Sequence, residues 1–421
     1  LIIPISSLTI AESVFRYGME KANNKKSVFS TGIYVVTVGS IALAIIGLLT
    51  QNWWGTEKAG IWLMMIYSIC NMYRNISSQF LRAIGKVKIF TIDNIVQTLS
   101  ILCFNILFLA WFKLGVMGYM LGYILGNLLS FCFGIVAGKL WKYLCSPNIP
   151  KKIIKEMLIF SIPLIPNTIC WWISSSTDRI MIVGWIGKSA NGLYSVAHKI
   201  PSILSILVTI FVQAWQISAN EEFEKSDRSE FYSKVFEVLA VFCFIGSSLL
   251  MLFSKIETRI IASRDYYESW SVMVALIIGM TFFSFAQFLG TIYTANKKTA
   301  MAFATNMISA IVNVVLNMIF IPKYGAQGAA IATSISYLVL WISRIITTDK
   351  IVHIQMRVKE VILSSVLIVV QGAVQILEVP YWQILGTGCL LGLVVVNYSL
   401  VCSIVKAGYG MMKEKVGHGK K

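Results

Sequence analysis

The chain alternates long apolar stretches with short polar connections, and this pattern predicts a membrane protein built from helices. Twelve stretches approach or exceed the roughly 20 residues that a helix needs to cross a bilayer. They run at about 31–50, 59–81, 89–110, 115–138, 157–183, 191–218, 235–253, 269–295, 299–321, 325–343, 361–377 and 381–405. Because each stretch crosses once, successive connections belong alternately to one side of the membrane, side one, and to the other, side two.

Lys and Arg are divided unequally between the two sides. Side one, which includes residues 16–26, carries 26 of the 36 basic residues, whereas side two carries 7. The remaining three, Arg74, Arg179 and Lys199, lie inside predicted spans. Positive charge is retained in cytoplasmic connections, so we expect side one and the C-terminus to be cytoplasmic.

Composition agrees with a multi-pass membrane protein. Hydrophobic residues make up 57% of the chain and charged residues 13%, against about a quarter charged in soluble domains. The topology accounts for most of the net charge of +17, so no nucleic-acid partner is expected, and the bilayer with its anionic headgroups is the expected partner. The cysteines form no CxxC pair and the three histidines are scattered, so the sequence predicts neither a metal site nor a cofactor.

The chain contains an internal repeat. The motif K-x-G-x-x-G occurs at 113–118 and again at 323–328, 210 residues later, at the same place in the predicted topology. Both copies follow a span that enters from the cytoplasm, so the halves are expected to be related by an axis along the membrane normal. The expected organisation is an N-terminal bundle (1–138), a basic cytoplasmic linker (139–156), a C-terminal bundle (157–347), an additional transmembrane hairpin (348–405) and a basic cytoplasmic tail (406–421).

The span 157–183 has the richest set of polar side chains. Its polar stripe recurs at offsets 0, 4, 7 and 11, which places the four side chains on one helical face, and it consists of Asn167, Trp171, Ser174 and Asp178. Arg179 follows directly, and Pro163 and Pro166 should kink the helix near its inner end. Charge at membrane depth usually faces an interior, so we interpret this helix as lining a central path. The alternative is an acid–base pair that fixes helix packing.

Three further sets of polar residues have two possible roles. Asp178 could pair with Arg179 or with Lys199 on the next span, leaving one cation for an anionic substrate. Arg74 and Asp93 could neutralise each other, or Arg74 could meet the substrate. The amides Asn306 and Asn313 suit sugar hydroxyls, but amides also hold membrane helices together.

Several segments resemble the bacterial oligosaccharide flippases of O-antigen and polysaccharide biosynthesis. That family shares a superfamily with multidrug antiporters and the lipid II flippase. The matching segments are AESVFRYGME (11–20), FLRAIGKVKIF (80–90), FSIPLIPNTICWWISSSTDRIMIVGWIGKSANGLYSVAHKIP (160–201), FVQAWQISANEEF (211–223) and KYGAQGAAIAT (323–333). The segment 160–201 is the most specific, and the resemblance extends over nearly the whole chain.

The resemblance implies a fold and a function. The fold is all-α, with two pseudo-symmetric six-helix bundles around a central cavity and two extra C-terminal helices; the first helix and part of the second are expected to be absent from this chain. The function is alternating-access transport, not catalysis, of oligosaccharide on undecaprenyl pyrophosphate across the bacterial inner membrane, for O-antigen or capsular polysaccharide. A polysaccharide polymerase and a chain-length regulator are candidate partners.

The resemblance also assigns roles to the candidate site residues. Arg16 ends the second helix and joins Arg74, Arg179 and Lys199 as a cavity cation for the pyrophosphate, while Trp171 and the amides contact sugars. One alternative is a multidrug or cation antiporter of the same superfamily, a class that prefers acidic cavities. Another is a membrane polysaccharide polymerase, which would need an external loop with clustered acids or histidines, and the connection 254–268 is the one candidate for such a loop.

Overall fold

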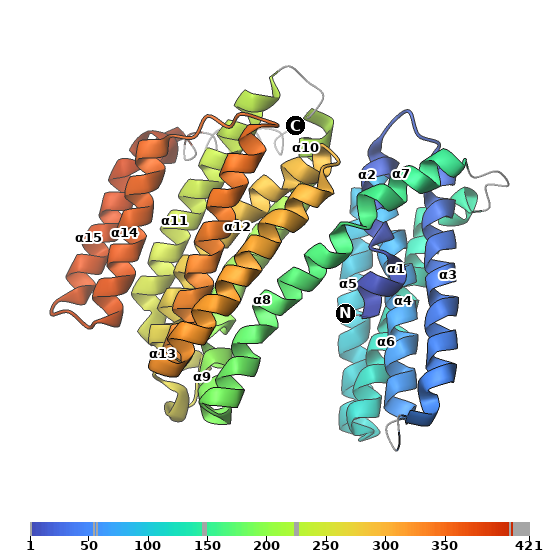
Figure 1. Ribbon diagram of the computed structural model, residues 1–421, viewed down its shortest axis with the longest axis horizontal. Helices are drawn as coiled ribbons and strands as arrows, with labels where there is room; N and C mark the ends of the chain where they lie inside the picture. Colours follow the sequence, from blue (N-terminus) through green and yellow to red (C-terminus); the bar gives the residue numbers. More distant parts are fainter. Residues whose placement is uncertain are drawn as a thin grey trace, which may run out of the picture. The chain divides into compact units, whose positions relative to one another are not determined.

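The computed structural model describes residues 2–53, 55, 58–144, 150–222, 227–403 and 406 (Figure 1). Throughout these ranges the regular structure is helical and contains no β-strand, which confirms the predicted all-α class. The helices gather into two compact units. Unit 1 comprises Leu1–Ile169 with the short segment Lys297–Ala300, and unit 2 comprises Cys170–Asn296 with Met301–Lys421.

Unit 1 is organised around α4, α5 and α6, which pack on one another. Its aromatic core includes Phe29 and Phe80, whose stacked rings lie 4.5 Å apart. The Asn24 side chain accepts from the backbone N–H of Lys26 and so caps α3. The helices are α1 (Ile2–Ser7), α2 (Ile10–Met19), α3 (Lys25–Thr50), α4 (Lys58–Ala83), α5 (Val87–Asn105) with a π-helical continuation (Ile106–Trp111), α6 (Gly115–Gly138), α7 (Lys151–Ser161) and the start of α8 (Leu164–Trp185).

Unit 2 is built around α12, the most deeply buried of the described membrane-length helices. α14 and α15 lie side by side (Figure 1), and both pack against α11. Besides the remainder of α8, its helices are α9 (Lys188–Ala197), α10 (Lys199–Glu222), α11 (Arg228–Ile261), α12 (Ser269–Ala295), α13 (Thr299–Asp349), α14 (Val358–Ile376) and α15 (Trp382–Val396).

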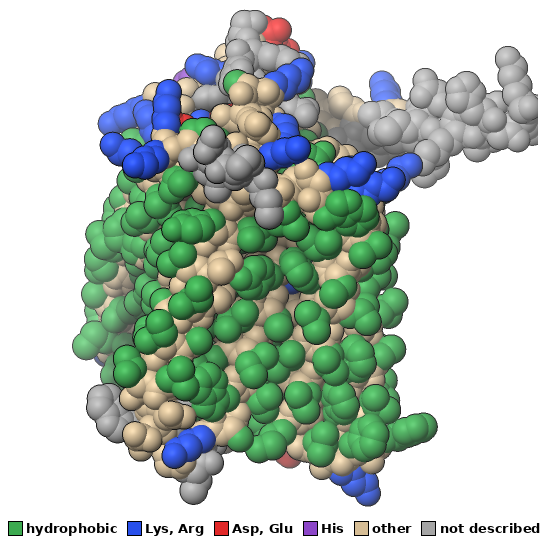
Figure 2. Space-filling model, turned by 90° about the vertical axis from the view of Figure 1, so that its right-hand side faces the viewer, with side chains coloured by type: hydrophobic (Ala, Val, Ile, Leu, Met, Phe, Trp, Pro, Cys, Tyr) green, Lys and Arg blue, Asp and Glu red, His purple; other side chains and the backbone are tan. Residues whose placement is uncertain are grey.

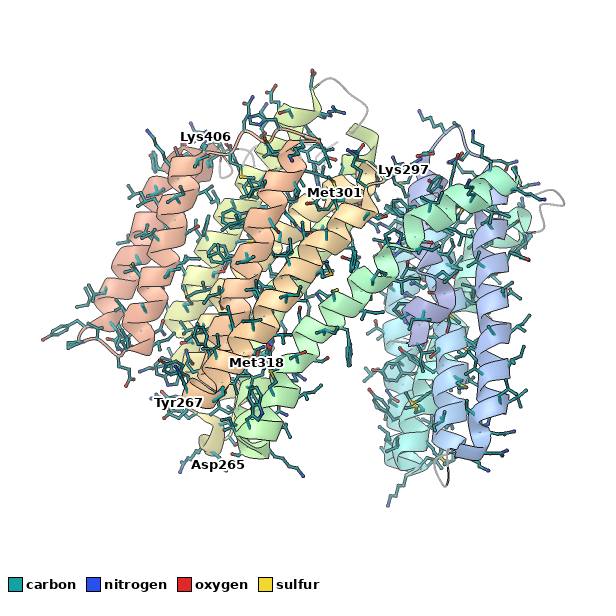
Figure 3. All side chains as sticks on the ribbon, viewed as in Figure 1. Asp265, Tyr267, Lys297, Met301, Met318 and Lys406 are labelled. Carbon is teal, nitrogen blue, oxygen red and sulfur yellow. The ribbon has the colours of Figure 1, made fainter. Side chains whose placement is uncertain are left out.

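The helices have the length and surface of membrane spans. Among the described residues, 9 helices are long and apolar enough to cross a bilayer. Apolar side chains form a broad band on the face drawn in Figure 2, and Lys and Arg gather at its two edges. Within unit 2, Met301 and Lys406 lie at one end and Asp265 and Tyr267 at the other (Figure 3), as the predicted alternation of sides requires.

Two predicted spans are interrupted. The span 157–183 belongs to two helices, α7 and α8, that separate at Ile162 and Pro163, because proline removes a backbone donor and clashes with the preceding turn. The expected kink is therefore present, and the helix before it begins earlier than predicted, at Lys151. The span 191–218 is likewise divided between α9 and α10 at His198.

The sequence pattern places one basic residue in the wrong environment. The charge count puts Arg344 in a cytoplasmic connection, because the apolar stretch ends at residue 343. Instead α13 continues to Asp349, and Arg344 is buried inside the unit with 7% of its surface exposed. Helical geometry carries the side chain to the packed face of α13 even though the neighbouring sequence becomes polar.

The two K-x-G-x-x-G motifs form locally similar turns. Their first glycines, Gly115 and Gly325, have φ of +56° and +57°, a conformation that glycine adopts without the strain that a side chain brings. Their second glycines lie close to the preceding helix. A Cβ at Gly118 would meet the Phe108 carbonyl oxygen at 3.2 Å, and one at Gly328 would meet that of Phe320 at 2.3 Å. Both motifs therefore mark tight turns between antiparallel helices.

Substitution of Gly328 should destabilise unit 2. A methyl group there overlaps backbone atoms of Phe320, so Gly328→Ala should cost about 1–3 kcal/mol through overpacking. Gly388→Ala on α15 is the matched control, because a Cβ at Gly388 meets nothing within 4 Å. Thermal unfolding in detergent measures both variants, and equal midpoints would contradict the close approach.

Candidate functional site

A buried carboxylate forms the centre of a polar cluster in unit 2. Asp178 on α8 is 2% exposed. Its Oδ2 accepts hydrogen bonds from the Tyr194 hydroxyl at 2.6 Å and the Thr333 hydroxyl at 2.7 Å. Its Oδ1 accepts from Nδ2 of Asn317 at 2.6 Å. Three neutral donors therefore hold one carboxylate at membrane depth, where an ionisable group is expensive and usually functional.

Two asparagines extend this cluster along the first part of α13. Nδ2 of Asn317 lies 3.1 Å from Oδ1 of Asn313, and Nδ2 of Asn313 lies 3.3 Å from Oγ1 of Thr333. Oδ1 of Asn317 is buried and, within the described part of the chain, has no hydrogen-bond partner. A buried oxygen without a donor beside a buried carboxylate is a combination that an additional cation would satisfy.

The local fold explains how the cluster assembles. Tyr194 comes from α9, Asn313 and Asn317 from the part of α13 before the turn at Gly325, and Thr333 from the part after it. Asn313 and Asn317 are separated by one helical turn and so share a face. The reversal at Gly325 brings Thr333 back beside them. Four helical segments therefore meet at Asp178.

The predicted ion pair of Asp178 is not formed among the described residues. Both Arg179 and Lys199 are exposed, and Asp178 accepts instead from the neutral groups just described. Arg179 follows Asp178 in the helix, so its side chain points about 100° away around the axis. The sequence alone could not predict which side chains donate to Asp178, because hydroxyl and amide donors are common in the spans.

The polar stripe of α8 is divided between two environments. Ser174 is buried like Asp178, with 8% exposed, whereas Trp171 is 50% exposed. Asn167 is half-buried and belongs to unit 1. The predicted polar stripe is therefore not uniformly buried along the length of α8.

The candidate cations of unit 1 are both paired. Arg16 is buried, and its Nη1 lies 2.8 Å from Oε1 of Glu20, one turn later. Nη2 of Arg74 lies 3.3 Å from Oδ2 of Asp93 and 2.6 Å from Oδ1 of Asn94. Oδ1 of Asp93 also accepts from the Ser130 hydroxyl at 2.6 Å. Of the two roles considered for Arg74, the geometry favours mutual neutralisation with Asp93.

Another buried arginine, Arg344, was missed by the sequence reasoning. It donates to the backbone carbonyl of Ala286, to Oδ1 of Asn306 at 3.2 Å and to Oγ1 of Thr305 at 3.5 Å. Asn306, predicted as a sugar ligand, thus contacts this guanidinium. The absence of a side chain at Gly290 leaves room for it, because a Cβ there would lie 2.7 Å from Nη1.

The oxygens around Asp178 are of the kinds that bind hard cations. Hard cations take carboxylate, amide and hydroxyl oxygens, and all three kinds converge here. Tyr194 and Thr333 can each rotate a hydroxyl hydrogen away and offer a lone pair. Among the described residues, no group of three or more His, Cys, Asp or Glu side chains is placed to hold a metal ion.

Comparison with known families identifies the family of this chain. The family model described as "Polysaccharide biosynthesis protein" matches residues 5–217, half of the chain. The chain belongs to this family. A second model, described as the lipid II flippase MurJ, matches residues 263–395. The predicted membership of the oligosaccharide flippase family is thereby confirmed.

Two curated relatives share part of this sequence. The chain is 24% identical over 192 residues to the capsular polysaccharide biosynthesis protein CapF of Staphylococcus aureus, a match that covers 45% of this chain and 48% of CapF. It is 24% identical over 284 residues to the uncharacterized membrane protein MJ1068 of Methanocaldococcus jannaschii, covering 64% of this chain and 54% of that protein. The matches thus span about half the length of these relatives.

Solved structures share the fold of this family member. A structure of MATE in the bent conformation matches with a TM-score of 0.69 at 12% identity, covering 87% of this chain and 85% of that one. The lipid II flippase MurJ in an inward closed conformation matches with a TM-score of 0.58 at 14% identity, covering 95% and 94%. At these identities the likeness concerns the fold alone.

Proposed function

We propose that this protein is a flippase. It moves oligosaccharide units linked to undecaprenyl pyrophosphate from the cytoplasmic to the periplasmic leaflet, for assembly of O-antigen or capsular polysaccharide. The observation that carries the proposal is the match of the polysaccharide biosynthesis family over residues 5–217. The partial match to CapF supports a capsular product.

The proposed substrate has three parts that need different environments. Its pyrophosphate is anionic, and Arg179 and Lys199 are exposed cations on unit 2 that can attract it. Its sugars need hydrogen-bonding and stacking groups, for which the half-exposed indole of Trp171 is a candidate. Its polyprenyl tail is as apolar as the bilayer and can remain there while the head crosses.

Transport against a gradient needs an energy source, and the chain lacks the GxxxxGK[ST] motif of ATP-binding loops. We assign that role to a monovalent cation bound at Asp178. Without the cation, Tyr194, Asn317 and Thr333 donate to the carboxylate. A bound cation would be held by the carboxylate, by the two hydroxyl oxygens and by Oδ1 of Asn317, which has no hydrogen-bond partner among the described residues. Because four helical segments meet there, this exchange changes their packing and biases one conformation.

Removing the charge of Arg179 should strongly reduce surface polysaccharide without lowering the protein level. Arg179→Ala deletes an exposed side chain, so folding is little affected, whereas loss of a substrate contact should reduce polymer about tenfold or more. Lys188→Ala, an exposed cation at the start of α9, is the control and should leave polymer unchanged. Immunoblots of membranes and gels of extracted glycan give the two readouts. Wild-type polymer in Arg179→Ala would remove this residue from the mechanism.

A further inference from the structure

Two cavities in unit 2 are neighbours and share part of their walls. The larger, of about 530 Å³, lies among α12, the second part of α13 and α14, and all but one of its lining side chains are apolar. The smaller, of about 420 Å³, lies beside the loop between α13 and α14 and is lined by the polar residues Thr348, Asp349, His353 and Gln355 as well as apolar ones. Ile345, Met356 and Val358 line both cavities. We call the combined space the α13–α14 groove.

The polarity of this groove changes with depth in the membrane. Its polar mouth lies at the last turn of α13, at the end of unit 2 that also carries Lys406 (Figure 3). Its apolar part reaches back along α13 to Leu338, eleven residues or about 16 Å along the helix axis. The mouth is therefore at headgroup level and the apolar part at acyl-chain level.

The walls of the groove are held in place by helix packing and by stacked rings. α14 packs against α11, α12 and α15, and the groove lies between it and the second part of α13. On the opposite wall, the rings of Phe282 and Trp341 are stacked with centroids 5.5 Å apart. Protein interiors leave few voids of this size, and the volume lies in the range of ligand sites. An apolar chain that fills the groove would contact both walls.

The mouth is lined by an acid paired with a histidine. Oδ1 of Asp349 lies 2.6 Å from Nδ1 of His353, and the Asp349 side chain is 55% exposed. Lys350 and Lys359 are next to lining residues in the sequence and are exposed, but they are not among the residues that line the cavity. A headgroup that contains both an ammonium and a phosphate complements this arrangement. A purely anionic headgroup would be repelled by the Asp349 carboxylate. A quaternary ammonium headgroup has no N–H and so cannot donate a hydrogen bond to that carboxylate.

We propose that the α13–α14 groove holds a resident phospholipid with an ethanolamine headgroup. One acyl chain occupies the apolar cavity, the ammonium donates to Asp349, and the phosphate lies near Lys350 and Lys359. The lipid contacts both α13 and α14 and so holds the α14–α15 hairpin in position. This inference depends only on the membrane location of unit 2 and not on which substrate is transported.

Native mass spectrometry of the purified full-length protein tests this proposal directly. The protein is reconstituted into nanodiscs of phosphatidylethanolamine and phosphatidylglycerol and then released in mild detergent. Wild type should retain one phosphatidylethanolamine. Val366→Trp, which fills the apolar cavity, should reduce retention about tenfold, equivalent to 1.4 kcal/mol. The control is Val395→Trp on α15, a position that is 71% exposed and outside the groove.

A second variant tests the headgroup without altering the cavity. Asp349→Asn should remove the preference for phosphatidylethanolamine over phosphatidylcholine, whereas Glu360→Gln, in the first turn of α14, should leave that preference unchanged. The proposal is overturned by equal retention in the two Trp variants, by retention of phosphatidylglycerol or a polyprenyl phosphate instead, or by no retained lipid in wild type. Because lipid retention is read without a transport assay, failure of the flippase proposal would leave this result unaffected.

Discussion

Asp178→Asn is expected to abolish ion-coupled transport while the protein still accumulates in the membrane. Asparagine has the size of aspartate and can still accept from Tyr194 or Thr333, so the contacts among α8, α9 and α13 largely persist. It lacks the charge that a cation requires, so surface polymer should fall to the level of a flippase-deficient strain. Glycan transport driven by imposed Na⁺ or proton gradients in vesicles measures the effect and separates the two ions.

Two further variants define the role of this carboxylate. Asp178→Ala leaves three buried donors without an acceptor, at about 1–3 kcal/mol each, and should prevent accumulation of folded protein. Ser174→Ala, one turn earlier on α8 and also buried, should behave like wild type. If Asp178→Asn transported normally with an unchanged ion requirement, the cluster would be a structural element only.

Removal of Arg74 is expected to cause the second large effect, a loss of stability in unit 1. Asp93 is 0% exposed and pairs with Arg74. Arg74→Met therefore leaves a buried carboxylate without its cation, which costs about 3–5 kcal/mol. The double variant Arg74→Met with Asp93→Asn removes both charges and should recover most of that stability.

A double-mutant cycle on thermal unfolding in detergent measures this coupling. Lys88→Met, an exposed cation near the start of α5, is the control and should have little effect. A substrate-binding role makes the opposite prediction: Arg74→Met would fold normally and lose transport, and neutralising Asp93 would not restore it. Additive effects of the two substitutions would therefore contradict the assignment of Arg74 to helix packing.

Much of the fold could be predicted from the spacing of apolar residues. Hydropathy depends on the chain alone, so the spans, the break at Pro163 and the turns at Gly115 and Gly325 follow from local sequence. The pairing of Arg74 with Asp93 could also be predicted, because both charges lie near the same end of adjacent antiparallel spans. In each case the physical cause is a short-range property of the backbone or of neighbouring helices.

The partners of Asp178 and the location of Arg344 depend on tertiary contacts that the sequence does not contain. Tyr194 and Thr333 lie in segments that were singled out for their family resemblance, yet their hydroxyls reach Asp178 only after α9 and α13 fold back. Arg344 follows an apolar stretch and so resembles a flanking basic residue. It is buried because Gly290 on α12 leaves space for a guanidinium.

Genetic complementation tests the central claim most directly. The full-length protein is expressed in a strain that lacks its own oligosaccharide flippase and makes a matching repeat unit, with Asp178→Asn as the inactive control. The flippase proposal predicts that wild type restores polymeric surface glycan and that lipid-linked units no longer accumulate. Stable membrane expression with continued accumulation of lipid-linked units and no polymer would contradict it, and drug-efflux assays would then test the antiporter alternative.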